Sequence, residues 1–222
     1  MIPKREDHER WIQQYLKRFP ELVKEFRACL NGYEKIQSNH RIDNKSLKAI
    51  FHAASSSRIP LSFTATCFLS ELSTHYAEVR EAILKMSDDN HWYVRLSALL
   101  SLGRGTPRNF VLVLLKKALQ DRSSRVRGLA ASRAYSLRVL KIIPDIENQL
   151  AREHHPDAKF SMDFHLRLLR DGYFLQTEGR DFSLLWIPIR DGIQGHPVAQ
   201  KDIDTRGIQT IISEIRRNAD GE

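Results

Sequence analysis

Residues 87–137, SDDNHWYVRLSALLSLGRGTPRNFVLVLLKKALQDRSSRVRGLAASRAYSL, contain a pattern that recurs along the chain with a constant 32-residue period. One column of this pattern is acidic, and a second column, six positions later, is basic. Three further columns are apolar or small. The five columns are Asp89, Asp121 and Glu153; Arg95, Arg127 and Lys159; Val94, Val126 and Ala158; Ala98, Ala130 and Met162; and Leu102, Ala134 and Leu166. Five coherent columns at one spacing predict a repeat architecture.

The spacing inside each copy is helical. Val94, Ala98 and Leu102 are about one helical turn apart, so they form a narrow apolar stripe that faces a neighbouring helix. A small residue in the middle of the stripe lets the two helices approach closely. The acid and the base at the turn between copies can pair along the stack and satisfy exposed groups at the helix ends. The pattern therefore predicts packed helix pairs joined by ion pairs.

Helical spacing extends on both sides of this stretch. Trp11, Tyr15 and Phe19 begin an apolar run that continues to Leu30, and Pro20 inside it predicts a kink or the start of a second helix. The further predicted helices cover residues 44–55, 60–73, 75–86, 91–103, 107–120, 123–137, 139–152 and 156–171. These helices are short and closely connected, so we expect successive helices to pack as antiparallel neighbours.

The last fifty residues have a different period. Three segments, 173–176, 182–189 and 193–200, are predicted strands, and Asp191-Gly192 between two of them is a hairpin signal. Pro188 and Pro197 are expected to confine their strands to an edge or a bulge.

A final helix is expected to follow these strands, starting after Asp204 or Thr205. It would bury one stripe, formed by Ile208, Ile211, Ile212 and Ile215. We therefore predict two domains, a helical repeat domain at 1–172 and a small β-hairpin or meander with a terminal helix at 173–222.

Composition excludes several classes of protein. The chain has 222 residues, of which 41% are hydrophobic and 28% charged, and this apolar content excludes disorder throughout. Cys29 and Cys67 are too few for a disulfide framework or a four-thiolate zinc site, and both lie in apolar helical patterns that predict burial. No apolar stretch is long enough for a membrane span, and the polar first ten residues do not resemble a signal peptide. We expect a soluble, cytoplasmic protein without a membrane partner.

Positive charge is concentrated in the middle of the chain. The net charge is +8, but residues 91–141 contain eleven basic residues and one acid, so this window carries +10 and the rest −2. Arg95 and Arg127 belong to the repeat columns. The other basic residues of the window are Arg104, Arg108, Lys116, Lys117, Arg122, Arg125, Arg133, Arg138 and Lys141. Surface helices normally mix both signs, so this excess predicts an electropositive binding surface.

The repeat columns resemble those of HEAT repeats, most clearly in Asp89, Val94, Arg95 and Ala98 and in their counterparts one period later in the chain. The resemblance covers roughly residues 60–171, although the third copy has Ala158, Lys159 and Met162 in place of Val, Arg and Ala. It implies a mainly α fold, a right-handed α-solenoid of helix pairs, here with the small C-terminal β-hairpin or meander plus helix. The usual role of such a stack is binding.

A solenoid would gather cations that are distant in the sequence. Arg104, Arg108, Arg138 and Lys141 fall near turns within successive helix pairs, so they should form a row along one edge. Arg122 and Arg125 fall at the opposite turns, with Lys116 and Lys117 on the helix before them. Trp92 and Tyr93 lie beside this basic window and complete the predicted binding residues.

The first functional hypothesis is a non-catalytic scaffold that binds an acidic protein partner. An inhibitory protein of the immunity type would be compatible with this architecture. The second hypothesis is a nucleic-acid-binding protein, including a helical-repeat DNA glycosylase that acts on alkylated bases, in which Asp88 or Asp89 would be catalytic. We found no common catalytic motif, so the first hypothesis is favoured, and no cofactor is predicted.

Three local features have alternative interpretations. The turn at 103–107 could receive a phosphate, but an ordinary connection between helices explains it better. The nearest approach to a metal-ligand cluster is His154-His155 with Asp157, but adjacent histidines in a turn point apart and no further ligand lies nearby in the sequence, so no metal site is predicted. Trp186 could be an exposed anchor for a partner, although a core position is favoured.

Overall fold

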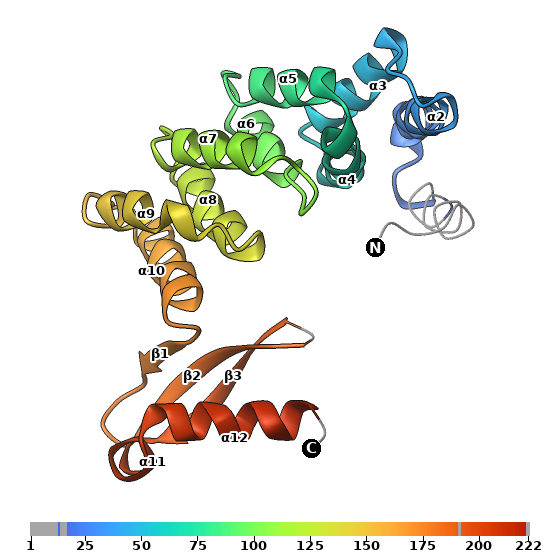
Figure 1. Cartoon of the computed structure of the whole chain (residues 1–222). Helices are drawn as coiled ribbons and strands as arrows, with labels where there is room; N and C mark the ends of the chain where they lie inside the picture. The colour runs from blue at the N-terminus through green and yellow to red at the C-terminus, as the bar shows by residue number, and fades with distance from the viewer. Residues whose placement is uncertain (1–12, 14–16, 191, 221–222) are drawn as a thin grey trace. The chain divides into compact units, whose positions relative to one another are not determined.

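The computed structural model describes residue 13, residues 17–190 and residues 192–220, so the predictions for Trp11, Tyr15 and Asp191 lie outside the described residues. In this part the chain is mainly helical and ends in a three-stranded antiparallel sheet with two helices (Figure 1). It divides into two compact units, Met1–Arg133 and Ala134–Glu222. The change from helix to strand, predicted at 172/173, lies between Arg170 and Phe174.

Each predicted helix within the described residues is present, with small differences at its ends. Pro20 starts a short 3₁₀ helix that leads into the next helix, as its restricted φ predicts. The helical elements of this part are η1 (Pro20–Leu22), α2 (Val23–Asn39), α3 (Asn44–Ala54), α4 (Ile59–His75), α5 (Ala77–Met86), α6 (Trp92–Leu100), α7 (Arg108–Leu119), α8 (Ser124–Ser136), η2 (Leu140–Ile142), α9 (Ile143–Leu150) and α10 (Pro156–Arg170).

The element boundaries reproduce the sequence period. Helices α4, α6, α8 and α10 begin at Ile59, Trp92, Ser124 and Pro156, so their starts follow the spacing of the sequence columns closely. The residues of the three apolar columns are all buried: Val94, Val126, Ala158, Ala98, Ala130, Met162, Leu102, Ala134 and Leu166. The repeat in the sequence is therefore a repeat of helix pairs.

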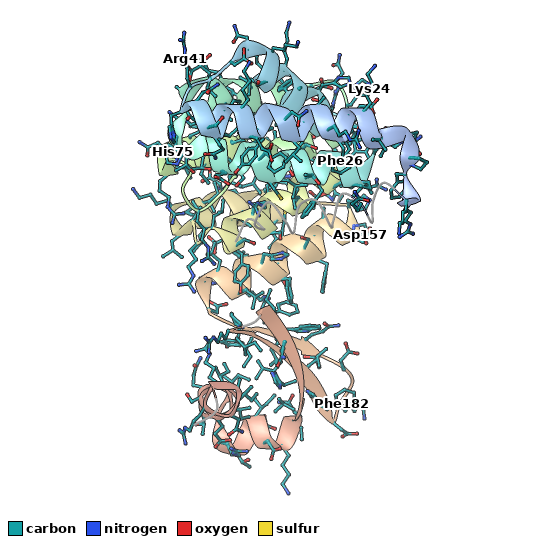
Figure 2. The ribbon with its side chains drawn as sticks, turned by 90° about the vertical axis from the view of Figure 1, so that its right-hand side faces the viewer. Lys24, Phe26, Arg41, His75, Asp157 and Phe182 are labelled. Atoms are coloured by element: carbon teal, nitrogen blue, oxygen red, sulfur yellow. The ribbon has the colours of Figure 1, made fainter. Side chains whose placement is uncertain are left out.

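Close contacts fix the first helices of unit 1. A Cβ atom at Gly32 would lie 2.9 Å from the Ser46 carbonyl oxygen, so glycine allows α2 and α3 to touch. The Tyr33 ring stacks on Phe68 of α4 with centroids 4.2 Å apart, and its hydroxyl donates to Glu71 over 2.7 Å. On α2 the labelled Phe26 is buried, whereas Lys24 is exposed (Figure 2).

The 103–107 turn is packed against α4. A Cβ atom at Gly103 would overlap the Ser70 hydroxyl, and the buried Thr106 hydroxyl accepts the Gly103 N–H over 2.9 Å. Thr106 also exchanges a 2.8 Å hydrogen bond with Ser73. These contacts explain the glycine and threonine as parts of a connection between helices.

The sheet in unit 2 has the order β1 (Phe174–Thr177), β2 (Phe182–Ile189) and β3 (Gly192–Ala199), followed by α11 (Gln200–Arg206) and α12 (Ile208–Asp220). Leu185, Ile187 and Val198 on one face of the sheet form a core with Ile211 and Ile212 of α12. The predicted final helix is present, but it starts at Ile208. Gly207, with φ of 76°, separates it from α11, which the sequence analysis did not predict.

The strand prolines occupy different positions from one another. Pro197 lies in β3, which is an edge strand as predicted. Pro188 lies in β2, which is the central strand of the sheet. The prediction that Pro188 confines its strand to an edge or a bulge is therefore wrong for the strand as a whole. The pairing of β1 with β2 ends at Phe174 opposite Trp186, so β2 has no β1 neighbour at Pro188 and needs no N–H there.

Trp186 has a packing role. Its ring is half-buried, meets Phe164 edge-to-face at 5.8 Å, and would lie 3.2 Å from a Cβ atom at Gly195. Cys29 is buried as predicted, and burial raises the pKa of its thiol to about 12. Cys67 is exposed, so the prediction that it is buried is wrong: it falls on the outward side of α4.

Candidate basic binding surface

One ion pair joins two helix pairs inside unit 1. Arg95, only 6% exposed, holds Asp121 with two hydrogen bonds, 2.6 Å from Nε and 2.8 Å from the guanidinium terminus. The other end of the guanidinium donates to the carbonyl oxygens of Asp89 and Asn90. Burial raises the pKa of Asp121, but hydrogen bonds from Arg95 and Ser123 outweigh this, and the pKa lies below its ordinary value. Arg95 therefore has a structural role, as its repeat column predicts.

The acids of the repeat column also accept hydrogen bonds from backbone N–H groups at the starts of helices. A carboxylate oxygen of Asp89 accepts the His91 N–H at 2.7 Å, and Asp121 accepts the Ser123 N–H at 2.7 Å. Glu153 accepts the His155 N–H at 3.0 Å in the same arrangement. In each case the acid lies two positions before the residue that precedes the helix, and it accepts the N–H of that preceding residue. This hydrogen bond lowers the pKa of Asp89, which is held as a carboxylate.

A tryptophan and an arginine meet on the surface beside this ion pair. Trp92 is the first residue of α6 and remains 40% exposed, and the Arg125 guanidinium lies 4.6 Å from the centre of its ring. Tyr93 meets Trp92 edge-to-face with centroids 6.0 Å apart. A guanidinium over an indole face is a favourable cation–π arrangement that leaves the positive charge in place.

Two further cations reach back to the same turn. Lys117 at the end of α7 donates to Asp88 over 2.5 Å and to the Ser87 hydroxyl over 2.9 Å. Arg122 donates to the Asn90 carbonyl oxygen over 2.5 Å. Together with Trp92 and Arg125, Lys117 and Arg122 form what we call the Trp92 cluster.

The contacts orient the cations of the Trp92 cluster without neutralising most of their charge. Asp88 pairs with Lys117, and the Asp121 carboxylate, which is bound to Arg95, lies near enough to Arg122 for that positive charge to help lower its pKa. Arg122 binds a neutral carbonyl and Arg125 a neutral ring. The cluster is thus a positively charged, partly aromatic surface whose side chains are already ordered.

The other predicted binding residues are distributed more widely. Arg104, Arg108 and Lys116 are exposed in unit 1, whereas Arg138 and Lys141 are exposed in unit 2. The predicted row of four cations is therefore divided between the two units. Arg133 is half-buried and donates to the Leu102 carbonyl, and its burial lowers the pKa of its guanidinium.

The sequence did not reveal some of the site's residues. Ser87 and the Asn90 carbonyl, which hold Lys117 and Arg122, carry no charge pattern that would mark them. The contact between Trp92 and Arg125 could have been predicted from the repeat. One period after Trp92 is position 124, which is next to Arg125, so the two residues occupy neighbouring positions on successive copies.

Both carboxylates of the glycosylase hypothesis are engaged in contacts within the chain. Asp88 pairs with Lys117 on the surface, and Asp89 accepts the N–H that starts α6. Across the described residues, no three His, Cys, Asp or Glu side chains converge as a metal site requires. None of the helices in that same part combines the length and apolar character needed to cross a bilayer.

Comparisons of the chain with family models, with curated proteins and with solved structures give no match.

Proposed function

We propose that this chain is a non-catalytic binding protein whose helix pairs stack as a HEAT-like solenoid, and that the Trp92 cluster binds an acidic surface of a partner protein. The observation that carries this proposal is the exposed indole of Trp92 beneath the Arg125 guanidinium, with Lys117 and Arg122 held beside it. Trp and Arg side chains dominate the binding energy of many protein interfaces.

The contacts within the cluster support tight binding. Long cationic side chains lose conformational entropy when they bind, and this loss opposes association. Arg122 and Arg125 are already ordered by a carbonyl oxygen and a ring, so less entropy remains to be lost. Their charge also attracts an acidic partner before contact and raises the association rate.

An acidic protein fits the cluster better than a nucleic acid does. Proteins that bind duplex DNA with strong salt dependence contact about six to ten phosphates. The Trp92 cluster contains three cations, Lys117, Arg122 and Arg125, which are fewer than such a duplex-binding surface uses.

The test combines affinity capture with matched charge reversals. The full chain is used as bait in an extract of the cells that make it, with and without nuclease, beside Arg122→Glu/Arg125→Glu and Arg180→Glu/Arg190→Glu variants. Arg180 and Arg190 are exposed at the ends of β2, so the second variant makes the same charge change away from the cluster.

We expect one acidic protein to be captured by the wild type and by the control variant, with or without nuclease, and to be lost with Arg122→Glu/Arg125→Glu. Equal capture by all three chains would contradict the proposal. Circular dichroism melts establish that each variant is folded.

Nucleic-acid binding is the second candidate, because residues 91–141 carry a net charge of +10. Fluorescence anisotropy with labelled duplex and single-stranded oligonucleotides at low salt separates the two. The acidic-protein proposal expects no saturable binding. Binding whose affinity falls steeply with added salt would favour the nucleic-acid candidate.

A further inference from the structure

The third helix pair, α9–α10, has a face that corresponds to a covered face of the first pair, α5–α6. In unit 1 that face of α5–α6 receives the next pair, because Arg95 on α6 binds Asp121 at the start of α8. Its residues Met86, Arg95 and Leu99 are at most 6% exposed. Two periods further along the chain, the corresponding residues of the third pair are Leu150, Lys159 and Asp163.

These corresponding residues line an open groove between α9 and α10. The groove has a volume of about 480 Å³ and is lined by Leu150, Pro156, Lys159, Phe160 and Asp163. Phe160 is 52% exposed, and the Lys159 side chain is also exposed. After α10 the chain forms β1, and all five residues that line this groove belong to α9 and α10 themselves.

The charges on this face are unevenly compensated. Asp163 pairs with Arg167 at 2.9 Å, and Glu147, which corresponds to the buried Leu115 of α7, pairs with Arg170 at 3.0 Å. Lys159 has no carboxylate partner among the residues that the structure describes. A purely solubilising end of a stack would be polar throughout. Here an unpaired cation lies beside an exposed phenyl ring and a leucine.

We propose that the α9–α10 groove binds a helix and its preceding turn from the acidic partner, with an Asp or Glu of that turn paired to Lys159. The contact would reproduce the Arg95–Asp121 ion pair, and apolar residues next to the acid would pack on Phe160 and Leu150. This inference rests on the proposed function for the existence of a protein partner. It adds the second surface and the chemistry of the segment that occupies it.

A second copy of this chain is a poorer occupant. This chain carries a net charge of +8, so two copies repel each other, whereas an acidic partner is attracted to Lys159. Size-exclusion chromatography with light scattering tests this point, and a dimer that Lys159→Glu dissociates would overturn the proposal.

The main test uses a photo-crosslinking residue, p-benzoylphenylalanine, in place of Phe160 in the full chain. A second chain carries it in place of Trp92. Both are irradiated in nuclease-treated cell extract, and the attached partner peptide is identified by mass spectrometry. Lys159→Glu is then added to the Phe160 probe, with Lys201→Glu, another exposed lysine, as the matched control.

We expect the position-160 adduct to contain an Asp or Glu near the start of a helix. Lys159→Glu should reduce its yield at least about tenfold, Lys201→Glu should leave it unchanged, and reversing the partner's acid to Lys should restore it. An adduct at position 92 but none at 160, or a 160 adduct insensitive to Lys159→Glu, overturns this inference alone. Adducts at neither position overturn the proposed function as well. Thermal melts of the variants exclude loss of folding as the cause.

Discussion

Arg95 and Arg125 lie in the same region of unit 1, yet their environments differ completely. Arg95 is buried, bound to both oxygens of Asp121 and to two backbone carbonyls. Arg125 is exposed and rests on the ring of Trp92. A buried cation paired with a carboxylate holds the fold together and offers nothing to a partner. A cation that is ordered by a neutral group keeps its charge available to a partner. The kind of contact that each arginine makes, more than the number of basic residues, therefore separates a structural arginine from a candidate binding arginine.

The largest effect is expected from Asp121→Ala. This change leaves the Arg95 guanidinium buried without a carboxylate and removes the acceptor that begins α8. The free energy of unfolding should fall by about 3–5 kcal/mol, measured by urea unfolding followed by circular dichroism. Arg125→Ala should change it by less than about 1 kcal/mol. Similar losses for both variants would remove the distinction between the two arginines.

The same ion pair should give a smaller effect through pH. The pKa of Asp121 in the folded chain lies below its ordinary value of 3.8. The unfolded chain therefore binds more protons, and the stabilisation is present above pH 4 and lost as the pH falls through the folded pKa. Urea unfolding between pH 6 and pH 2.5 should show this loss. In Asp121→Asn the acid limb should be flatter, and an unchanged limb would contradict the assignment.

Trp92→Ala tests the exposed side of the comparison. Removing an aromatic anchor from the centre of an interface should weaken binding of the captured partner by about 2 kcal/mol, or roughly thirtyfold in Kd. Isothermal titration calorimetry measures this effect. The unfolding free energy should change by less than about 1 kcal/mol, because the ring is 40% exposed. A large loss of stability with unchanged affinity would assign Trp92 to the fold.

Asp89→Ala should have an intermediate, purely structural effect. It removes the acceptor for the His91 N–H, and the loss of one hydrogen bond of this kind costs about 1 kcal/mol. Chemical denaturation checks the value. Neither this variant nor the wild type should release a base from an oligonucleotide that contains an alkylated adenine. Release by the wild type that Asp89→Asn abolishes would revive the glycosylase hypothesis.

Asp88→Asn should have the smallest effect. Its pair with Lys117 is exposed on both sides, with side chains 68% and 37% exposed, and such pairs contribute less than about 0.5 kcal/mol. The same change makes the Trp92 cluster more positive, so the partner should bind slightly faster at low salt. Stopped-flow association rates at two salt concentrations measure this, and a slower rate would argue against an acidic partner.

Most of the fold could be predicted because the helix pairs repeat local signals. An acid just before a helix start and a stripe such as Val94, Ala98 and Leu102 specify contacts within the pair itself. The presence of α11 and the exposure of Cys67 on α4 depend on which faces the rest of the chain covers, and periodicity does not determine that. Pro188 illustrates the same difficulty, since its position relative to the end of β1 depends on strand register.

The candidate site was harder to predict than the fold. The excess of basic residues in 91–141 was visible, but the sequence does not distinguish a buried Arg95 from an exposed Arg125. The division of Arg104 and Arg138 between separate compact units also has no local signal. The groove beside Lys159 was missed because the repeat column suggested a paired base, whereas the acid of a following copy is absent.

The hydrogen bond that recurs between an acidic side chain and a backbone N–H at a helix start also limits which insertions and deletions this chain can accept. Each of these bonds is closed within a single short turn, while the next bond of the same kind lies a full period further along the chain. Duplication or deletion of one whole period would preserve every such bond and leave the stripes facing their partners. Gain or loss of a few residues inside a helix would rotate the stripe into solvent. We therefore expect descendants of this gene to differ in length by complete modules, with small insertions restricted to the connecting turns.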